Sequence, residues 1–257
     1  MAEVTGIPAR EHARALFLDV DGTLLEIAET PQAVHVPARL RHALTVAADR
    51  EAGALALVSG RKISDLDALF QPQRFPAAGV HGLERRNAAG GFIEPAIDHH
   101  ALDQARVHLT QMARSRPGLL IEDKRWALAA HFRKVPHLED EIRAVMESLC
   151  RTLQPHFCLQ TGKRVIELKP AVHSKRTAIA SFMREPPFAG RLPVFIGDDD
   201  TDEDGFAAVN EQGGLSIRVG YAMPTVARWR LANVNEVIRW LAMPRQPHGR
   251  AISNLPL

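Results

Sequence analysis

Two aspartates, two positions apart, stand at the end of an apolar run and could do chemistry together. Asp19 and Asp21 follow the apolar residues 16–18 and precede Gly22. Alternate side chains of a strand share a face, so both carboxylates would emerge where the strand ends and Gly22 lets the chain turn. Carboxylates this close repel unless Mg²⁺ lies between them or one holds a proton. Both conditions suit phosphoryl transfer with Asp19 as nucleophile, although a solvated turn without chemistry fits the same four residues.

A second acidic group follows another apolar run late in the chain. Residues 193–196 lead into Gly197, after which Asp198, Asp199 and Asp202 occur. Ligands of open α/β sheets bind beyond the carboxyl ends of the strands, so two such ends can meet at one edge. Two acidic strand ends would repel each other without a hard cation, and oxygen ligands favour Mg²⁺. A metal ion is therefore predicted between the strand end that carries Asp19 and Asp21 and the one that carries Asp198, Asp199 and Asp202.

Two further side chains could hold the oxygens of a phosphoryl group. Ser59 ends the apolar run 54–58 and offers a hydroxyl, and Lys175 lies in the first turn of a predicted helix and offers a fixed positive charge. A serine that begins a turn and a solvated lysine explain the same residues without function. Their common placement at strand ends and helix starts favours the chemical interpretation.

A calcium-binding module is the competing hypothesis from a different class. Asp200, Asp202, Asp204, Gly205 and Glu211 have the spacing of an EF-hand loop. The segment follows a buried type of strand rather than an amphipathic helix, and no second such loop occurs in the sequence, which disfavours this hypothesis. The twelve histidines show no zinc-binding spacing.

The composition is typical of a globular protein. The chain has 257 residues, 46% of them hydrophobic and 24% charged, with a net charge of +2. The basic residues are scattered, so neither nucleic acid nor a membrane surface is an expected partner. Cys150 and Cys158 form no CxxC pair, which argues against a disulfide scaffold or a thiolate metal site. The absence of a leader-like start and of a bilayer-length apolar run indicates a cytoplasmic protein, and the sequence is compatible with a monomer.

Strand and helix patterns alternate along most of the chain. A helix is expected from Pro37, with Leu40, Ala43, Leu44 and Ala47 on its buried face, and another over residues 63–70 with Ser64 as N-cap. This alternation predicts an α/β fold with a doubly wound, mostly parallel sheet. Residues 215–219 are expected to form a strand near the sheet edge, residues 233–241 a closing helix, and the last dozen residues a frayed tail.

The alternation is interrupted in the middle of the chain. Residues 87–91 resemble a hairpin loop. Helices are then expected over 98–116 and 136–153, with strands over 119–122, 126–133, 157–161 and 165–168. We interpret this block as an inserted smaller α/β cap domain, residues 98–169, in a core domain formed by residues 1–97 and 170–257.

Together the four separated segments resemble a known superfamily. DVDGT at 19–23, VSGR at 58–61, SK at 174–175 and GDDDTDE at 197–203 occur in the order of the haloacid-dehalogenase-like phosphatases. GxHGxE at 79–84, AxHFR at 129–133 and VIELKP at 165–170 are similar to the trehalose-6-phosphate phosphatase family, over residues 15–241. The resemblance implies a Rossmann-like core, a mobile cap and a Mg²⁺-dependent sugar-phosphate monoester hydrolase. Trehalose 6-phosphate is the expected substrate, with phosphoglycerate glycosides and sucrose phosphate as alternatives.

The resemblance also implies roles for individual residues. Asp19 becomes an aspartyl-phosphate, and Asp21 protonates the departing sugar oxygen and later activates water. Mg²⁺ is held by the Asp19 carboxylate, the Asp21 carbonyl and Asp198, with Asp199 and Asp202 acting through water, while Ser59 and Lys175 hold the phosphoryl oxygens. The implied substrate contacts are Gly60, Arg61, His81 and Glu84 from the core and Arg133, Glu167 and Lys169 from the cap. Glu167 and Lys169 alternate with apolar residues and equally fit an ordinary solvent-facing strand. Arg125 and Arg176 occupy positions where the family often has glycine.

Overall fold

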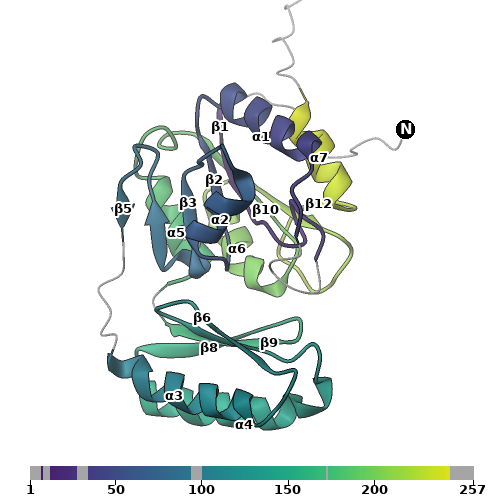
Figure 1. Cartoon of the computed structure of the whole chain (residues 1–257). Helices are drawn as coiled ribbons and strands as arrows, with labels where there is room; N and C mark the ends of the chain where they lie inside the picture. Colours follow the sequence, from purple (N-terminus) through teal and green to yellow (C-terminus); the bar gives the residue numbers. More distant parts are fainter. Residues whose placement is uncertain (1–6, 8–11, 28–33, 94–99, 172, 244–257) are drawn as a thin grey trace, which may run out of the picture.

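The main sheet of the protein has eight strands and is parallel except at one end. The computed structural model describes residues 7, 12–27, 34–93, 100–171 and 173–243. The strand order is β12-β11-β10-β1-β2-β3-β4-β5, with β4 and β5 antiparallel to their neighbours. Helices lie on both faces of this sheet (Figure 1), which confirms the predicted fold class. The strands are β1 Arg14–Leu18, β2 Leu55–Val58, β3 Ala77–Gly79, β4 Glu84–Arg86, β5 Phe92–Ile93, β10 Leu192–Gly197, β11 Leu215–Val219 and β12 Trp229–Leu231.

The central strand β1 is buried on both faces, which explains its unbroken apolar sequence. Leu16 and Leu18 pack in one cluster with α1 (Ala38–Arg50), α2 (Ile63–Phe70) and α7 (Val234–Ala242). Ala15 and Phe17 pack in the opposite cluster with α5 (Lys175–Phe182) and α6 (Glu203–Glu211). A strand covered by helices on both sides loses the apolar and polar alternation of a half-exposed strand.

The helices α1 and α2 have the predicted positions, but one predicted cap is wrong. Helix α1 follows Pro37 and buries the four predicted residues. Helix α2 begins at Ile63, so Ser64 lies inside it and Lys62 is the N-cap residue, without a side-chain cap bond. The Ile63 N–H donates instead to the Glu84 carboxylate, because β4 brings that side chain to the start of the helix.

Near the end of the chain, β11 lies close to the sheet edge as predicted, with only the short β12 paired beyond it among the described residues. The structure excludes the alternative of a calcium-binding loop. Residues 200–211 form a 3₁₀ turn, Asp200–Asp202 (η4), followed by α6, so the EF-hand loop is not present. Side chains of a helix point outward in different directions and cannot surround one ion. Gly205 serves packing, since a Cβ there would lie 2.4 Å from the Phe195 ring.

The inserted segment has its own sheet and its own apolar core. Its four strands are antiparallel in the order β6-β7-β9-β8, and its two helices cover the face turned away from the main sheet (Figure 1). We call residues 100–170 the cap. Its elements are α3 His100–Arg114, β6 Leu120–Asp123, β7 Leu128–His131, α4 Glu139–Leu153, β8 Phe157–Gly162 and β9 Val165–Pro170. The predicted start of α3 at residue 98 lies outside the described residues, and the limits 98 and 169 stay predictions.

The cap touches the core through a small apolar cluster at one side. Trp126 and Ala127 of the cap pack against Val80 and Leu83 of the core, and all four are buried. Arg125 stacks its guanidinium 4.4 Å from the Trp126 ring and has a φ of 72°, a conformation that glycine adopts more easily. Arg125 is therefore held in a backbone conformation that is strained for a residue with a side chain.

Candidate active site

The carboxyl ends of three neighbouring strands bring the predicted reactive residues to one edge of the sheet. Strand β1 lies between β2 and β10, and Leu18 pairs with Leu57 on one side and Ile196 on the other. Asp19, Ser59 and Asp198 therefore follow the strands at the same level. A carboxylate oxygen from each of Asp19, Asp198 and Asp202 lies within 4.8 Å of the others. The structure thus joins the two acidic groups that are about 180 residues apart in the sequence.

Lys175 lies at the centre of this carboxylate group. Its Nζ is 2.7 Å from Asp19 Oδ1 and 2.5 Å from Asp202 Oδ1. Asp202 is fully buried, and its second oxygen accepts the backbone N–H groups of Asp198 and Asp199. Ser174 caps α5 reciprocally with Thr177 and so fixes the first turn that carries Lys175. Both Asp202 oxygens are thus used inside the protein.

The three buried carboxylates carry more negative charge than one lysine neutralises. Burial and the neighbouring Asp202 raise the pKa of Asp198 to about 6, although Lys163 opposes the shift. Burial also raises the pKa of Asp19 well above its ordinary value, against the opposing charge of Lys175. The pKa of Lys175 lies above its ordinary value, because Asp19 and Asp202 outweigh the effect of burial. This excess of negative charge and the all-oxygen donor set fit a hard divalent cation.

Gly22 allows the two acidic strand ends to approach each other. It has a φ of +87°, and a Cβ would lie 2.1 Å from Asp198 Oδ2. Gly22→Ala is therefore expected to displace Asp198 and to lower activity about 10- to 100-fold, with a higher requirement for a divalent cation. Gly53→Ala is the matched control, since Gly53 has a φ of +81° but its nearest atom to a Cβ lies 3.9 Å away. Equal kinetics and equal divalent-cation dependence in the two variants would contradict the prediction.

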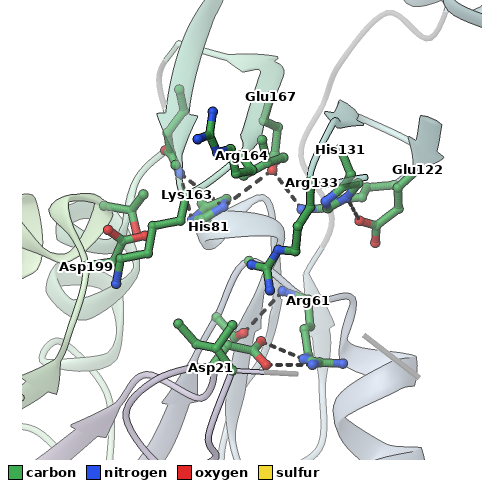
Figure 2. A pocket seen from close by; sticks show the side chains of 18 of the residues that line it. Asp21, Arg61, His81, Glu122, His131, Arg133, Lys163, Arg164, Glu167 and Asp199 are labelled. Atoms are coloured by element: carbon green, nitrogen blue, oxygen red, sulfur yellow. Dashed lines mark hydrogen bonds and ion pairs between the residues drawn. The ribbon is translucent and has the colours of Figure 1, made fainter. Parts of the chain in front are cut away.

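The β2 end supplies a hydroxyl and a guanidinium. Ser59 is buried, and its Oγ accepts the backbone N–H of Arg61. The Arg61 side chain holds Asp21 through two hydrogen bonds of 2.7 and 2.6 Å (Figure 2). Asp21 is thus oriented at the wall of the site, beside Asp19 in sequence and across from the cap.

A cavity of about 500 Å³ separates this edge of the core from the cap. On the cap side, Glu167 is buried, accepts from Lys124 at 2.7 Å and lies 3.5 Å from His81. Lys124 and His81 hold the pKa of Glu167 below its ordinary value, against the effect of burial. Its other oxygen, Oε1, has no hydrogen-bond partner within the part of the chain that the structure describes. Figure 2 shows Glu167 above His81 at this cavity.

His81 connects the core to the cap wall. Its backbone has a φ of 55° and donates to the Ser59 carbonyl, which turns the imidazole toward the cap. Gln160 of the cap lies 3.1 Å from the ring Nε2. Gly60 permits the approach of His81, since a Cβ at Gly60 would lie 2.6 Å from that nitrogen. Burial lowers the pKa of His81, although Glu167 opposes the shift.

The structure brings most of the predicted site residues to the cavity, but not all. Glu84 is bound to the start of α2, and Lys169 donates to the His173 carbonyl, so neither is in the cavity wall. Asp202 lies behind the wall. The predicted residues that line the cavity are Asp19, Asp21, Ser59, Gly60, Arg61, His81, Arg133, Glu167, Lys175, Asp198 and Asp199.

Several lining residues were not predicted from the sequence. Lys124 pairs with Glu167, Gln160 contacts His81, and Lys163 approaches Asp198. Glu122 and His131, on the paired strands β6 and β7, lie 2.8 Å apart (Figure 2). His131 belongs to the AxHFR motif at 129–133, whereas Lys124, Gln160, Lys163 and Glu122 have the sequence surroundings of ordinary polar strand and turn residues. Only the tertiary structure places these four at the cavity.

The comparisons with known proteins all indicate the same family. A family model described as trehalose-phosphatase matches residues 17–235. The trehalose-6-phosphate phosphatase of Escherichia coli K12 is 44% identical over 93% of this chain and 90% of its own length. A probable trehalose-phosphate phosphatase of Sinorhizobium fredii is 46% identical over 82% of this chain and 79% of its own length.

Solved structures share the fold. The C-terminal domain of the Candida albicans trehalose-6-phosphate phosphatase superposes with a TM-score of 0.80 at 24% identity, covering 90% of this chain and 92% of that domain. A protein described as trehalose-6-phosphate phosphatase related superposes with a TM-score of 0.73 at 26% identity, covering 88% of this chain and 94% of that chain.

Among the described residues, no helix combines the length and apolar character needed to cross a bilayer.

Proposed function

The chain belongs to the trehalose-phosphatase family, and from this premise we propose that it hydrolyses trehalose 6-phosphate to trehalose and phosphate. One observation carries the proposal. The buried group of Asp19, Asp198, Asp202 and Lys175 borders a cavity whose opposite wall includes Glu167, a buried carboxylate with one oxygen that has no hydrogen-bond partner among the described residues. One end of the cavity thus suits a phosphoryl group, and the other suits a sugar hydroxyl.

In the first step, Asp19 attacks phosphorus and forms an aspartyl-phosphate while the bond between phosphorus and the sugar oxygen breaks. Lys175 holds one Asp19 oxygen and leaves the other for attack. Asp21 gives a proton to the departing sugar oxygen. Arg61 holds both oxygens of Asp21, so at least one of these hydrogen bonds has to be released when Asp21 acts.

In the second step, Asp21 takes a proton from water, and the water oxygen attacks the phosphorus of the aspartyl-phosphate. The bond between phosphorus and Asp19 breaks, which regenerates the Asp19 carboxylate and releases phosphate. Asp21 thus acts as the general acid in the first step and as the general base in the second. The Ser59 hydroxyl and the Lys175 ammonium are proposed to hold the phosphoryl oxygens during both steps.

A divalent cation fits the acidic group, and we propose Mg²⁺. The Asp19 carboxylate, the Asp21 carbonyl and Asp198 would hold it, with Asp199 and Asp202 acting through water. Asp202 fits only such an indirect role, because both of its oxygens already accept protein hydrogen bonds. When bound, the cation would reduce the repulsion between the carboxylates and the phosphoryl oxygens.

Glu167 is the proposed anchor for a sugar hydroxyl. Glu167→Gln keeps the shape but removes the charge that Lys124 and His81 surround, so we expect KM to rise about tenfold or more with a smaller change in kcat. Steady-state kinetics with trehalose 6-phosphate measures this split. Glu122→Gln is the matched cap control, and it should affect KM less because Glu122 is half-buried and already pairs with His131. An unchanged KM in Glu167→Gln would contradict the assignment.

The direct test measures phosphate release from a panel of sugar phosphates, with Mg²⁺ and after its removal by EDTA. Trehalose 6-phosphate should give the highest kcat/KM, and EDTA should reduce turnover until Mg²⁺ is restored. Sucrose 6-phosphate and glucosyl-3-phosphoglycerate are the informative competitors. A higher kcat/KM for either would contradict the proposed substrate but not the phosphatase mechanism. Turnover that persists in EDTA would contradict the proposed Mg²⁺ dependence.

A further inference from the structure

A lysine from the cap reaches the acidic group of the core. Lys163 lies in the turn between β8 and β9, and its Nζ is 3.6 Å from Asp198 Oδ2. Figure 2 shows the long side chain of Lys163 extending beside Asp199. The other Asp198 oxygen accepts the hydroxyl of Thr23 at 3.3 Å. Lys163 therefore faces the Asp198 oxygen that remains for another cation.

The backbone of the same cap turn is close to the acidic loop. Strand β8 contacts the turn η4, which holds Asp200–Asp202. A Cβ at Gly162 would lie 3.8 Å from Asp199 Oδ2, so a glycine of this turn lies close to the Asp199 side chain. The turn between β8 and β9 lies at the opposite end of the cap sheet from the turn between β6 and β7, which carries Trp126 and Ala127 of the apolar cluster. The contact of Lys163 with Asp198 thus connects cap and core separately from the apolar cluster and from the contacts of His81 with Glu167 and Gln160.

We propose that Lys163 competes with the divalent cation for Asp198 and that cation binding releases this charged contact between cap and core. The inference rests on the proposed Mg²⁺ site and goes beyond the proposed function. An ammonium and a divalent cation on one carboxylate oxygen would repel each other across a few ångströms. Because the side chain of Lys163 is 58% exposed, solvent screens this repulsion and limits its size.

The competition works in both directions. If Lys163 weakens cation binding, then cation binding must weaken the contact of Lys163 with Asp198 by the same factor. The cap turn is thereby held against the acidic loop when no cation is bound. When the cation binds, Lys163 leaves Asp198 and its ammonium becomes free for another anion in the cavity.

The test measures Mg²⁺ binding to the metal-free protein by isothermal titration calorimetry, without substrate. Lys163→Met is expected to lower the Kd for Mg²⁺ about fivefold at low ionic strength, and the difference should shrink in 0.5 M NaCl. Lys134→Met removes a positive charge from another exposed lysine of the same cavity wall and controls for general electrostatics. Lys163→Arg keeps a cation at the position and should bind Mg²⁺ like the wild type.

Hydrogen exchange provides a second readout, first without Mg²⁺ and then with it. Without Mg²⁺, Lys163→Met should exchange faster than wild type in the turn of residues 162–165 and in the loop of residues 198–202. Adding Mg²⁺ to the wild type should increase exchange in residues 162–165. Equal Kd values for Lys163→Met and Lys134→Met, with unchanged exchange, would overturn the inference alone. Absence of Mg²⁺ binding in the wild type would overturn both it and the proposed metal site.

Discussion

Asp19→Asn is expected to reduce turnover of trehalose 6-phosphate on the order of 10⁴-fold while the fold persists. An amide cannot form the aspartyl-phosphate, and the site has no second carboxylate in the same position, because Asp202 is held behind the wall by three hydrogen bonds. The amide oxygen of asparagine can still accept from Lys175, whose Nζ lies 2.7 Å from the Asp19 oxygen. The chemical loss should thus be much larger than the structural one.

Phosphate release and chemical denaturation measure the two effects separately. The free energy of unfolding of metal-free Asp19→Asn should change by about 1 kcal/mol or less, since Lys175 keeps its pair with Asp202. Asp49→Asn, an exposed aspartate on α1, is the control for the loss of one negative charge. Turnover in Asp19→Asn within tenfold of the wild type would contradict the assignment of Asp19 as the nucleophile.

Lys175→Met is expected to damage both catalysis and stability. The substitution leaves Asp19 and Asp202 buried without their shared cation, and breaking such a pair from one side typically costs about 3–5 kcal/mol. Turnover should fall about 10³-fold, because the phosphoryl oxygens lose a fixed positive charge. Denaturant unfolding of the metal-free protein and initial rates at saturating Mg²⁺ measure the two losses.

The stability loss in Lys175→Met should depend on pH in a defined direction. Without the lysine, burial and the repulsion from Asp202 raise the pKa of Asp19 further above its ordinary value. A carboxyl whose pKa is raised on folding stabilises the fold below its unfolded pKa, and this contribution is lost as pH rises through the folded pKa. The variant should therefore be closer to the wild type at pH 5 than at pH 8.

Arg176→Met is the matched control on the next residue of α5. Arg176 is an exposed partner of Glu211, so its removal should change the free energy of unfolding by about 0.5 kcal/mol or less, with little pH dependence. Equal losses in Lys175→Met and Arg176→Met would show that Lys175 does not compensate the buried carboxylates.

The sequence by itself determined the central architecture. Continuous apolar runs such as residues 54–58 occur where a strand is covered on both faces, and the spacing of Leu40, Ala43, Leu44 and Ala47 identifies the buried face of a helix. These are local signals, because the period of a strand or helix is set by the backbone of that segment alone. The strand ends that carry Asp19 and Asp198 could thus be located from the sequence.

Only the tertiary structure decided which side chains meet. Glu84 was expected at the substrate but binds the start of α2, and the wall residues Lys124 and Gln160 had no signal in the sequence. The spacing of residues 200–211 fits a calcium loop, yet these residues form a helix because Phe206 and Val209 pack under the sheet. Pairing between distant strands and burial against another element are not encoded in local spacing, and they determine which carboxylates of this chain converge and which pack elsewhere.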